Sequence, residues 1–280
     1  MRDLFRAFFF KLSRDLTFRI TLIIGAGLSV LLVAMFALID SFSSSGQHIM
    51  CTGNVLFGFS FSPTSNFGLA IPINLISFTV LEFTHGIIRN KIVAGNSKVK
   101  IYLSLFLTGL VFTLSLLFIY VGLNTLLGTI IGGFDPYGMA MIGTTQGSIT
   151  PDFIWKYFIA CVLVYITITS FTVFITTLLR NIGPSIPIVI VLSMMLGLVL
   201  PMMYQLIPDL QESLGESPFY LNPLQIIGAP PVSYDSGYGA LGGTMVISNE
   251  RMIATTIANV MWTLIFAGFG TLIFVKRDVK

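Results

Sequence analysis

The feature that most constrains this chain is a series of long, uninterrupted apolar runs. A helix needs about 20 consecutive apolar residues to cross the hydrocarbon core of a bilayer. Only 10% of the residues are charged, against about 25% in soluble domains, so the charged shell of a water-soluble fold cannot be built. The sequence therefore predicts an all-α integral membrane protein with six membrane-spanning helices, at Ile20–Ile39, Phe67–Ile88, Ile101–Leu127, Tyr157–Leu179, Ile186–Ile207 and Met252–Val275.

The distribution of Lys and Arg predicts the orientation of these helices. If each run crosses the membrane once, 13 of the 15 basic residues fall on one side. Basic loops of membrane proteins stay in the cytoplasm, so we expect both termini to be cytoplasmic. Such a basic face is usual in membrane proteins and does not indicate a nucleic-acid partner. The chain contains no Asn-x-Ser/Thr glycosylation acceptor, which is compatible with a bacterial cytoplasmic membrane.

Two long stretches, residues 1–19 and 208–251, lie outside the predicted spans. Residues 1–19 place Leu and Phe on one helical face and Arg, Lys and Asp on the other, which is typical of an interfacial helix on the inner leaflet. This helix serves either as a topology anchor or as a docking element for a cytoplasmic partner. Residues 20–280 form the transmembrane domain, whose longest outer loop is 208–251. Cys51 and Cys161 are poorly placed to meet, so we expect no disulfide.

The sequence lacks the motifs of the common enzyme classes. It contains no G-x-x-x-x-G-K-[ST] phosphate loop, no G-x-S-x-G, no C-x-x-C and no H-E-x-x-H. Glu82 and His85 form a single E-x-x-H, whereas a di-iron site in a helical bundle needs two such motifs and further carboxylates. We therefore expect a chain that is not an enzyme and has no catalytic residue, no metal site and no cofactor of its own.

The basic segment 82–100, between the second and third predicted spans, is the strongest candidate for a functional site. Its stretch GIIRNKIVAG is compatible with a short helix between Gly86 and Gly95 that presents Ile side chains along one edge. Such a helix, with Ile beside Arg and Lys, fits a groove on another protein. Glu82 lies near membrane depth and needs a counter-ion, from this segment or from a partner. A loop that only fixes topology is the simpler alternative.

This segment, followed by KVKIYLSLFLTG, resembles the cytoplasmic coupling segment of type-2 ATP-binding-cassette (ABC) exporter permeases. FYLNPLQ and the tail GFGTLIFVKRDVK are similar to the last part of these permeases. The resemblance implies six helices, a second permease copy in a homodimer or heterodimer, and a separate cytoplasmic ATPase that binds ATP and Mg and holds the segment. It implies these ATPase-coupling residues: Glu82, Gly86, Ile88, Arg89, Asn90, Lys91, Gly95, Lys98 and Lys100.

The cargo does not follow from the fold, because one fold carries many substrates. The chain looks most like small permeases that export bacteriocins or amphipathic toxins such as phenol-soluble modulins. Met-rich surfaces adapt to varied apolar partners, so we expect a hydrophobic or amphipathic peptide, with Phe36, Asn74, Met194, Met195, Met202 and Met203 along its path. The alternatives are export of lipid, drug or polysaccharide, a sensor or scaffold that binds an ATPase without transport, and methionines that only fill space around Pro201.

Overall fold

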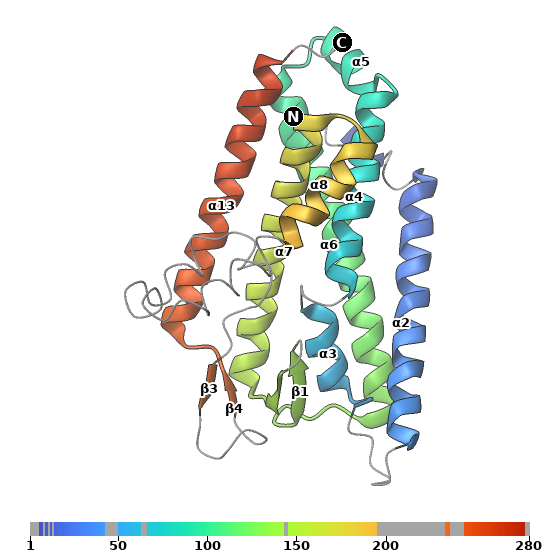
Figure 1. Ribbon diagram of the computed structural model, residues 1–280, viewed down its shortest axis with the longest axis vertical. Coiled ribbons are helices and arrows are strands. Elements are labelled where there is room, and N and C mark those ends of the chain that lie inside the picture. Colours follow the sequence, from blue (N-terminus) through green and yellow to red (C-terminus); the bar gives the residue numbers. More distant parts are fainter. Residues whose placement is uncertain are drawn as a thin grey trace.

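The computed structural model describes residues 6–7, 9–10, 12, 14–42, 50–62, 66–142, 145–194, 233–235 and 244–277, and it is mostly helical (Figure 1). Its longest helices contain 27 to 35 residues and are apolar enough to cross a membrane. At 1.5 Å per residue this is about 40 to 50 Å, more than the roughly 30 Å of hydrocarbon. The chain is therefore a multi-pass membrane protein. These helices are α2 (Leu16–Phe42), α6 (Lys98–Gly132), α7 (Pro151–Leu179) and α13 (Asn249–Lys276).

The second predicted span is broken. Helix α4 (Asn66–Thr84) is followed by the short helix α5 (Ile87–Val93), which is inclined by 51° to it. The predicted span runs to Ile88, but the helix ends earlier because Gly86 adopts a left-handed conformation with φ of 66°. Only glycine adopts that conformation at little cost. If the bent pair is one span, the described residues contain five.

The fifth predicted span is described only in part. Helix α8 (Ile182–Met194) begins four residues before the predicted start of this span, and its 13 residues amount to about 20 Å. The rest of the span, to Ile207, lies outside the described residues, so six spans remain a prediction. Residues 1–5, 8, 11 and 13 of the N-terminal stretch and most of the predicted outer loop 208–251 lie outside them as well.

Two elements of the connections between the long helices were not predicted. A nine-residue helix, α3 (Gly53–Phe61), follows α2, and the Thr52 hydroxyl accepts from the Val55 amide at its start. A small sheet of order β1-β2-β4-β3 is also present, so the all-α prediction is correct for the spans and wrong for the connections. These connections are rich in Gly, Thr and Ser, and their backbone groups pair with each other. The strands are β1 (Met139–Ile142), β2 (Thr145–Ser148), β3 (Ser233–Asp235) and β4 (Thr244–Val246).

Helix α7 is the central helix of the bundle, and its threonines bond both to its own carbonyls and to neighbouring helices. Thr172 and Thr177 donate to carbonyls of their own helix, while Thr169 donates to Thr113 on α6 at 2.9 Å. Thr167 donates to the side-chain oxygen of Asn259 on α13 at 2.8 Å. Inside a membrane the hydrophobic effect does not drive helices together, because the lipid tails are themselves apolar. Hydrogen bonds between hydroxyl and amide side chains of neighbouring helices therefore contribute to their association.

Helices α2 and α13 lie on opposite sides of the bundle, with α6 and α7 between them (Figure 1). On α2, the buried side is a row of mostly small or polar residues, while the outer side is apolar, with Ile23 and Leu31 71% and 67% exposed. This pattern is the reverse of that in a soluble helix and fits contact with lipid. The buried row consists of Thr21, Gly25, Ser29, Val33, Phe36 and Asp40.

The contact between α6 and α13 depends on a missing side chain. A Cβ at Gly270 would overlap the hydroxyl and ring of Tyr102, whose side chain is fully buried. We expect Gly270→Ala to lower the free energy of unfolding by about 1–3 kcal/mol, the usual cost of overpacking, as measured by thermal denaturation in detergent. On the same helix, a Cβ at Gly268 meets nothing within 4 Å, so Gly268→Ala is the matched control. Equal stability of the two variants would contradict this packing.

Candidate functional site

The candidate site is the segment 82–100, at the end of the molecule where α2 begins and α7 and α13 end (Figure 1). We call this the basic end. Described cations of this end come from four separate helix termini and from α5 between them. They include Arg19, Arg89, Lys91, Lys98, Lys100, Arg180, Lys276 and Arg277. The positive charge that the sequence places on alternate loops is thus gathered at one end of the fold.

Two glycines set the limits of α5. Gly86 precedes the helix, and Gly95 follows it with φ of 85°. A left-handed glycine just after the last turn is a common helix ending, and here the Gly95 amide donates to the Ile92 carbonyl at 2.9 Å. Helix α6 then begins at once, with Ser97 accepting from the Lys100 amide at its N-terminus. The short helix that the sequence suggested between the two glycines is present.

One face of α5 is anchored to the bundle. Ile88 is fully buried in the main hydrophobic core, and Ile92 packs against the same core. The Glu82 side chain, at the end of α4, is completely buried, and the Lys91 ammonium lies 3.3 Å from its carboxylate oxygen. Burying a carboxylate is costly unless a cation or hydrogen bonds compensate it. The pair therefore holds α5 against α4, with Lys91 as the counter-ion.

The opposite face of α5 is open. Arg89 and Asn90 are exposed, and Val93 is 80% exposed, so a basic and an apolar side chain stand side by side with no cover from the described residues. Val93, Ala94 and Gly95 continue this surface around the end of the helix. We call Arg89, Asn90 and Val93 the α5 outer face.

The base of the segment is tied to distant parts of the chain. The Lys98 ammonium donates to the carbonyls of Val275 and Arg277, at 3.0 and 3.2 Å, which joins the start of α6 to the end of α13. The Arg277 guanidinium donates to the Leu178 carbonyl and so joins α13 to α7. Lys100 is exposed on the first turn of α6. The start of α6 and the ends of α7 and α13 are therefore bonded to one another beside α5.

The sequence analysis missed Arg180, which stands between α7 and α8. This residue has a left-handed backbone with φ of 55°, and its guanidinium lies over the Phe83 ring, 5.7 Å from the centroid. Desolvation by burial, and then the nearby Arg277 charge, lower the pKa of Arg180. In the sequence, Arg180 is a single basic residue between two apolar runs. Such a residue indicates the orientation of the helices but not a contact with Phe83.

Among the predicted pathway residues, the described Asn74 and Phe36 do not lie together. Asn74 on α4 accepts from the Thr21 hydroxyl at 3.3 Å, near the start of α2. Phe36 packs edge-on against Phe59 of α3, with ring centroids 5.4 Å apart. Thr21 and Phe36 are 15 residues apart on one helix, or about 22 Å. Met194 is the last residue of α8, while Met195, Met202 and Met203 lie outside the described residues.

The described residues contain no group of three or more His, Cys, Asp or Glu that could hold a metal ion. Cys51 and Cys161 are both buried and free. No family model, no curated protein and no solved structure matches this chain. What α5 does is therefore inferred from its own residues and their geometry.

Proposed function

We propose that this chain is the membrane-spanning permease subunit of an ATP-driven exporter of the type-2 ABC kind. The basic end faces the cytoplasm, and a separate ATPase subunit, which binds ATP and Mg, docks on the α5 outer face. The observation that carries the proposal is α5 itself: a short helix, bent by 51° from α4, anchored on one face and open on the other. A loop whose only role was to fix the topology would need neither the bend nor the anchored face of α5.

The anchoring explains how motion would pass from the ATPase to the membrane. Ile88 and the Glu82–Lys91 pair fix α5 to the core and to the end of α4, so a push on Arg89 or Val93 displaces α4 rather than bending a loop. Lys98 connects the same segment to the end of α13. The motion therefore reaches two helices that lie on different sides of α7.

The energy must come from a partner, because the chain has no phosphate loop of its own. Two copies of this chain, or this chain and a paralogue, would enclose the translocation path. The bilayer covers the remaining apolar surface, and nothing in the charge pattern favours nucleic acid.

Hydrophobic or amphipathic peptides are the cargo that we propose. Helix α8 supports this choice, because it is mostly apolar and contains Pro184 and Pro187. A proline inside a helix frees a backbone carbonyl and bends the helix, and we expect the resulting irregular apolar surface to suit an apolar peptide. The alternatives, lipid, drug or polysaccharide export, are outcomes of the following experiment.

The experiment is ATP hydrolysis by the complex purified with this chain in mild detergent. We expect amphipathic helical peptides to raise the hydrolysis rate several-fold, because cargo binding favours the closed ATPase pair. A scrambled peptide of the same composition, without a helical apolar face, is the control. Stimulation by lipids or sugars but not by the peptide would contradict the proposed cargo, and a chain that purifies without any ATPase would contradict the function.

A further inference from the structure

Helix α3 does not span, yet it is almost entirely buried. Nine residues cover about 14 Å, and Val55, Leu56 and Phe61 are 4%, 0% and 0% exposed. Helix α3 and the residues just before it lie close against α6, and Gly128 and Gly132 of α6 permit this approach. A Cβ at either glycine would overlap side-chain or backbone atoms of residues 51–56. In Figure 1, α3 lies beside the outer half of α6, next to β1. Helix α3 thus fills the space between the long helices at the outer end of the bundle.

Hydrogen bonds from three parts of the chain hold α3 in place. The Asn54 amide donates to the Asp135 carbonyl, and its oxygen accepts from the Asp135 amide at 3.2 Å. Asn124 of α6 donates to the Ser60 hydroxyl at 2.8 Å. Tyr157 of α7 donates to the Gly58 carbonyl at 3.0 Å. We call these bonds the α3 latch. Exchange with water can replace each of them, unlike the apolar contacts deeper in the bundle.

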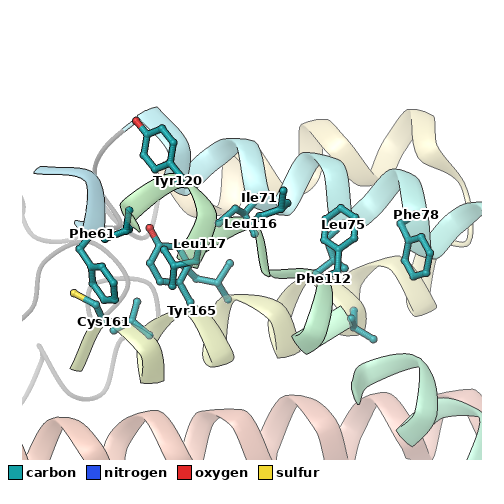
Figure 2. Close-up of a cluster of buried hydrophobic side chains, with 14 of the residues drawn as sticks. Phe61, Ile71, Leu75, Phe78, Phe112, Leu116, Leu117, Tyr120, Cys161 and Tyr165 are labelled. Atoms are coloured by element: carbon teal, nitrogen blue, oxygen red, sulfur yellow. The ribbon is translucent and has the colours of Figure 1, made fainter. Parts of the chain in front are cut away.

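Two polar groups near α3 have no hydrogen-bond partner in the described structure. They are the side-chain oxygen of Asn124 and the hydroxyl of Tyr165, and both side chains are completely buried. Tyr165 lies near Phe61 of α3 and Cys161 of α7 (Figure 2). A buried polar group without a partner costs about 1–3 kcal/mol, so such groups in a native protein mark strain or a function realised in another state.

We propose that α3 is a removable plug over a hydrogen-bonding site formed by Asn124 and Tyr165, which binds a backbone amide of the cargo. A peptide unit offers one N–H donor and one C=O acceptor. Asn124 offers an accepting oxygen for the first, and the Tyr165 hydroxyl donates to the second. Release of the α3 latch opens the site to the outer side. The peptide part of this inference rests on the proposed function, whereas the plug does not.

The chain carries its own reporter of plug release. Cys51 and Cys161 are its only cysteines, so a Cys51→Ala background leaves one thiol, which is fully buried near Phe61 (Figure 2). In the purified chain, we measure the rate at which a charged, water-soluble thiol reagent modifies Cys161. Asn54→Leu with Ser60→Ala cuts two parts of the latch, and we expect modification to become at least tenfold faster. The stability-matched control is Gly270→Ala, which loosens α6 against α13 and leaves α3 untouched.

The comparison of the two modification rates either supports or overturns the plug. Faster modification in the latch variant than in the Gly270→Ala variant, at the same interval below their melting temperatures, supports the plug. Equal rates in the two variants overturn it, since the thiol then reports general unfolding. This assay needs no ATPase, so its failure is distinct from failure of the proposed function.

The cargo contact is tested separately with Tyr165→Phe. This substitution removes only an unpartnered hydroxyl, so we expect an unchanged or higher melting temperature and a several-fold smaller stimulation of ATP hydrolysis by peptide. Full stimulation in the Tyr165→Phe variant would overturn the role of Tyr165. If the unaltered complex itself shows no stimulation by peptide, the peptide part of the site is overturned together with the proposed cargo, and the plug is judged by thiol access alone.

Discussion

Arg89→Glu combined with Val93→Asp is expected to weaken binding of the proposed ATPase subunit strongly. Both side chains are exposed on the α5 outer face, and neither belongs to the packed core. The fold should therefore survive, while the docking surface loses its basic charge and its apolar contact. A few residues at the centre of an interface, often Arg among them, contribute about 2 kcal/mol or more; with Arg89 in that role we expect binding weaker by roughly 100-fold, or about 2.7 kcal/mol. Titration of the purified ATPase onto the chain in nanodiscs measures this.

The matched control carries the same change of charge at the same end of the molecule. Val275 and Lys276 are also exposed, in the last turn of α13, so Lys276→Glu with Val275→Asp alters the basic end without touching α5. We expect the control to bind the ATPase nearly as well as the unaltered chain. Equal loss in the two variants would mean that general charge, and not α5, attracts the partner.

Lys91→Met should be the most destabilising change within the segment. It keeps the length of the side chain but removes the cation beside Glu82, whose side chain is completely buried. Removing one member of a buried ion pair costs about 3–5 kcal/mol, and because Lys91 is itself 18% exposed we expect a value near the lower limit. The melting temperature in detergent measures the change, and ATP hydrolysis should no longer be coupled to export.

Two further variants show whether the ion pair is the cause. The double variant Glu82→Gln, Lys91→Met removes both charges, so most of the lost stability should return, because an amide needs no counter-ion. Lys100→Met makes the same substitution at an exposed position on α6 and should change stability by less than about 0.5 kcal/mol. A Lys91→Met variant as stable as the unaltered chain would refute the anchoring of α5 by this pair.

The long helices were predictable because the bilayer imposes a simple length rule on them. Residues 20–39 and 252–275 fall within α2 and α13, and each helix extends only a few residues further. The short helix α5 was also within reach, since Gly86 and Gly95 are the residues that a left-handed start and end require. These features depend on the local sequence and on the thickness of the bilayer, so they can be predicted from a single sequence.

The missed features depend on contacts between distant segments. Nothing near Asn54 shows that its side chain bonds the backbone of Asp135, 81 residues away, and α3 has no amphipathic period because it is buried on nearly all sides. The pairing of β2 with β4 joins Ser148 to Thr244 across a hundred residues. Arg180 was a lone charge in the sequence, and only the fold places it beside Phe83.

The central claim is that α5 faces the cytoplasm and contacts an ATPase, and crosslinking in intact cells tests it most directly. A photoreactive residue at Val93, which is 80% exposed, should crosslink to a nucleotide-hydrolysing protein. The same residue at Ile130, 78% exposed at the opposite end of α6, should not. A crosslink from Ile130 in place of Val93, or no nucleotide-hydrolysing protein at Val93, would contradict both the orientation and the function proposed for this chain.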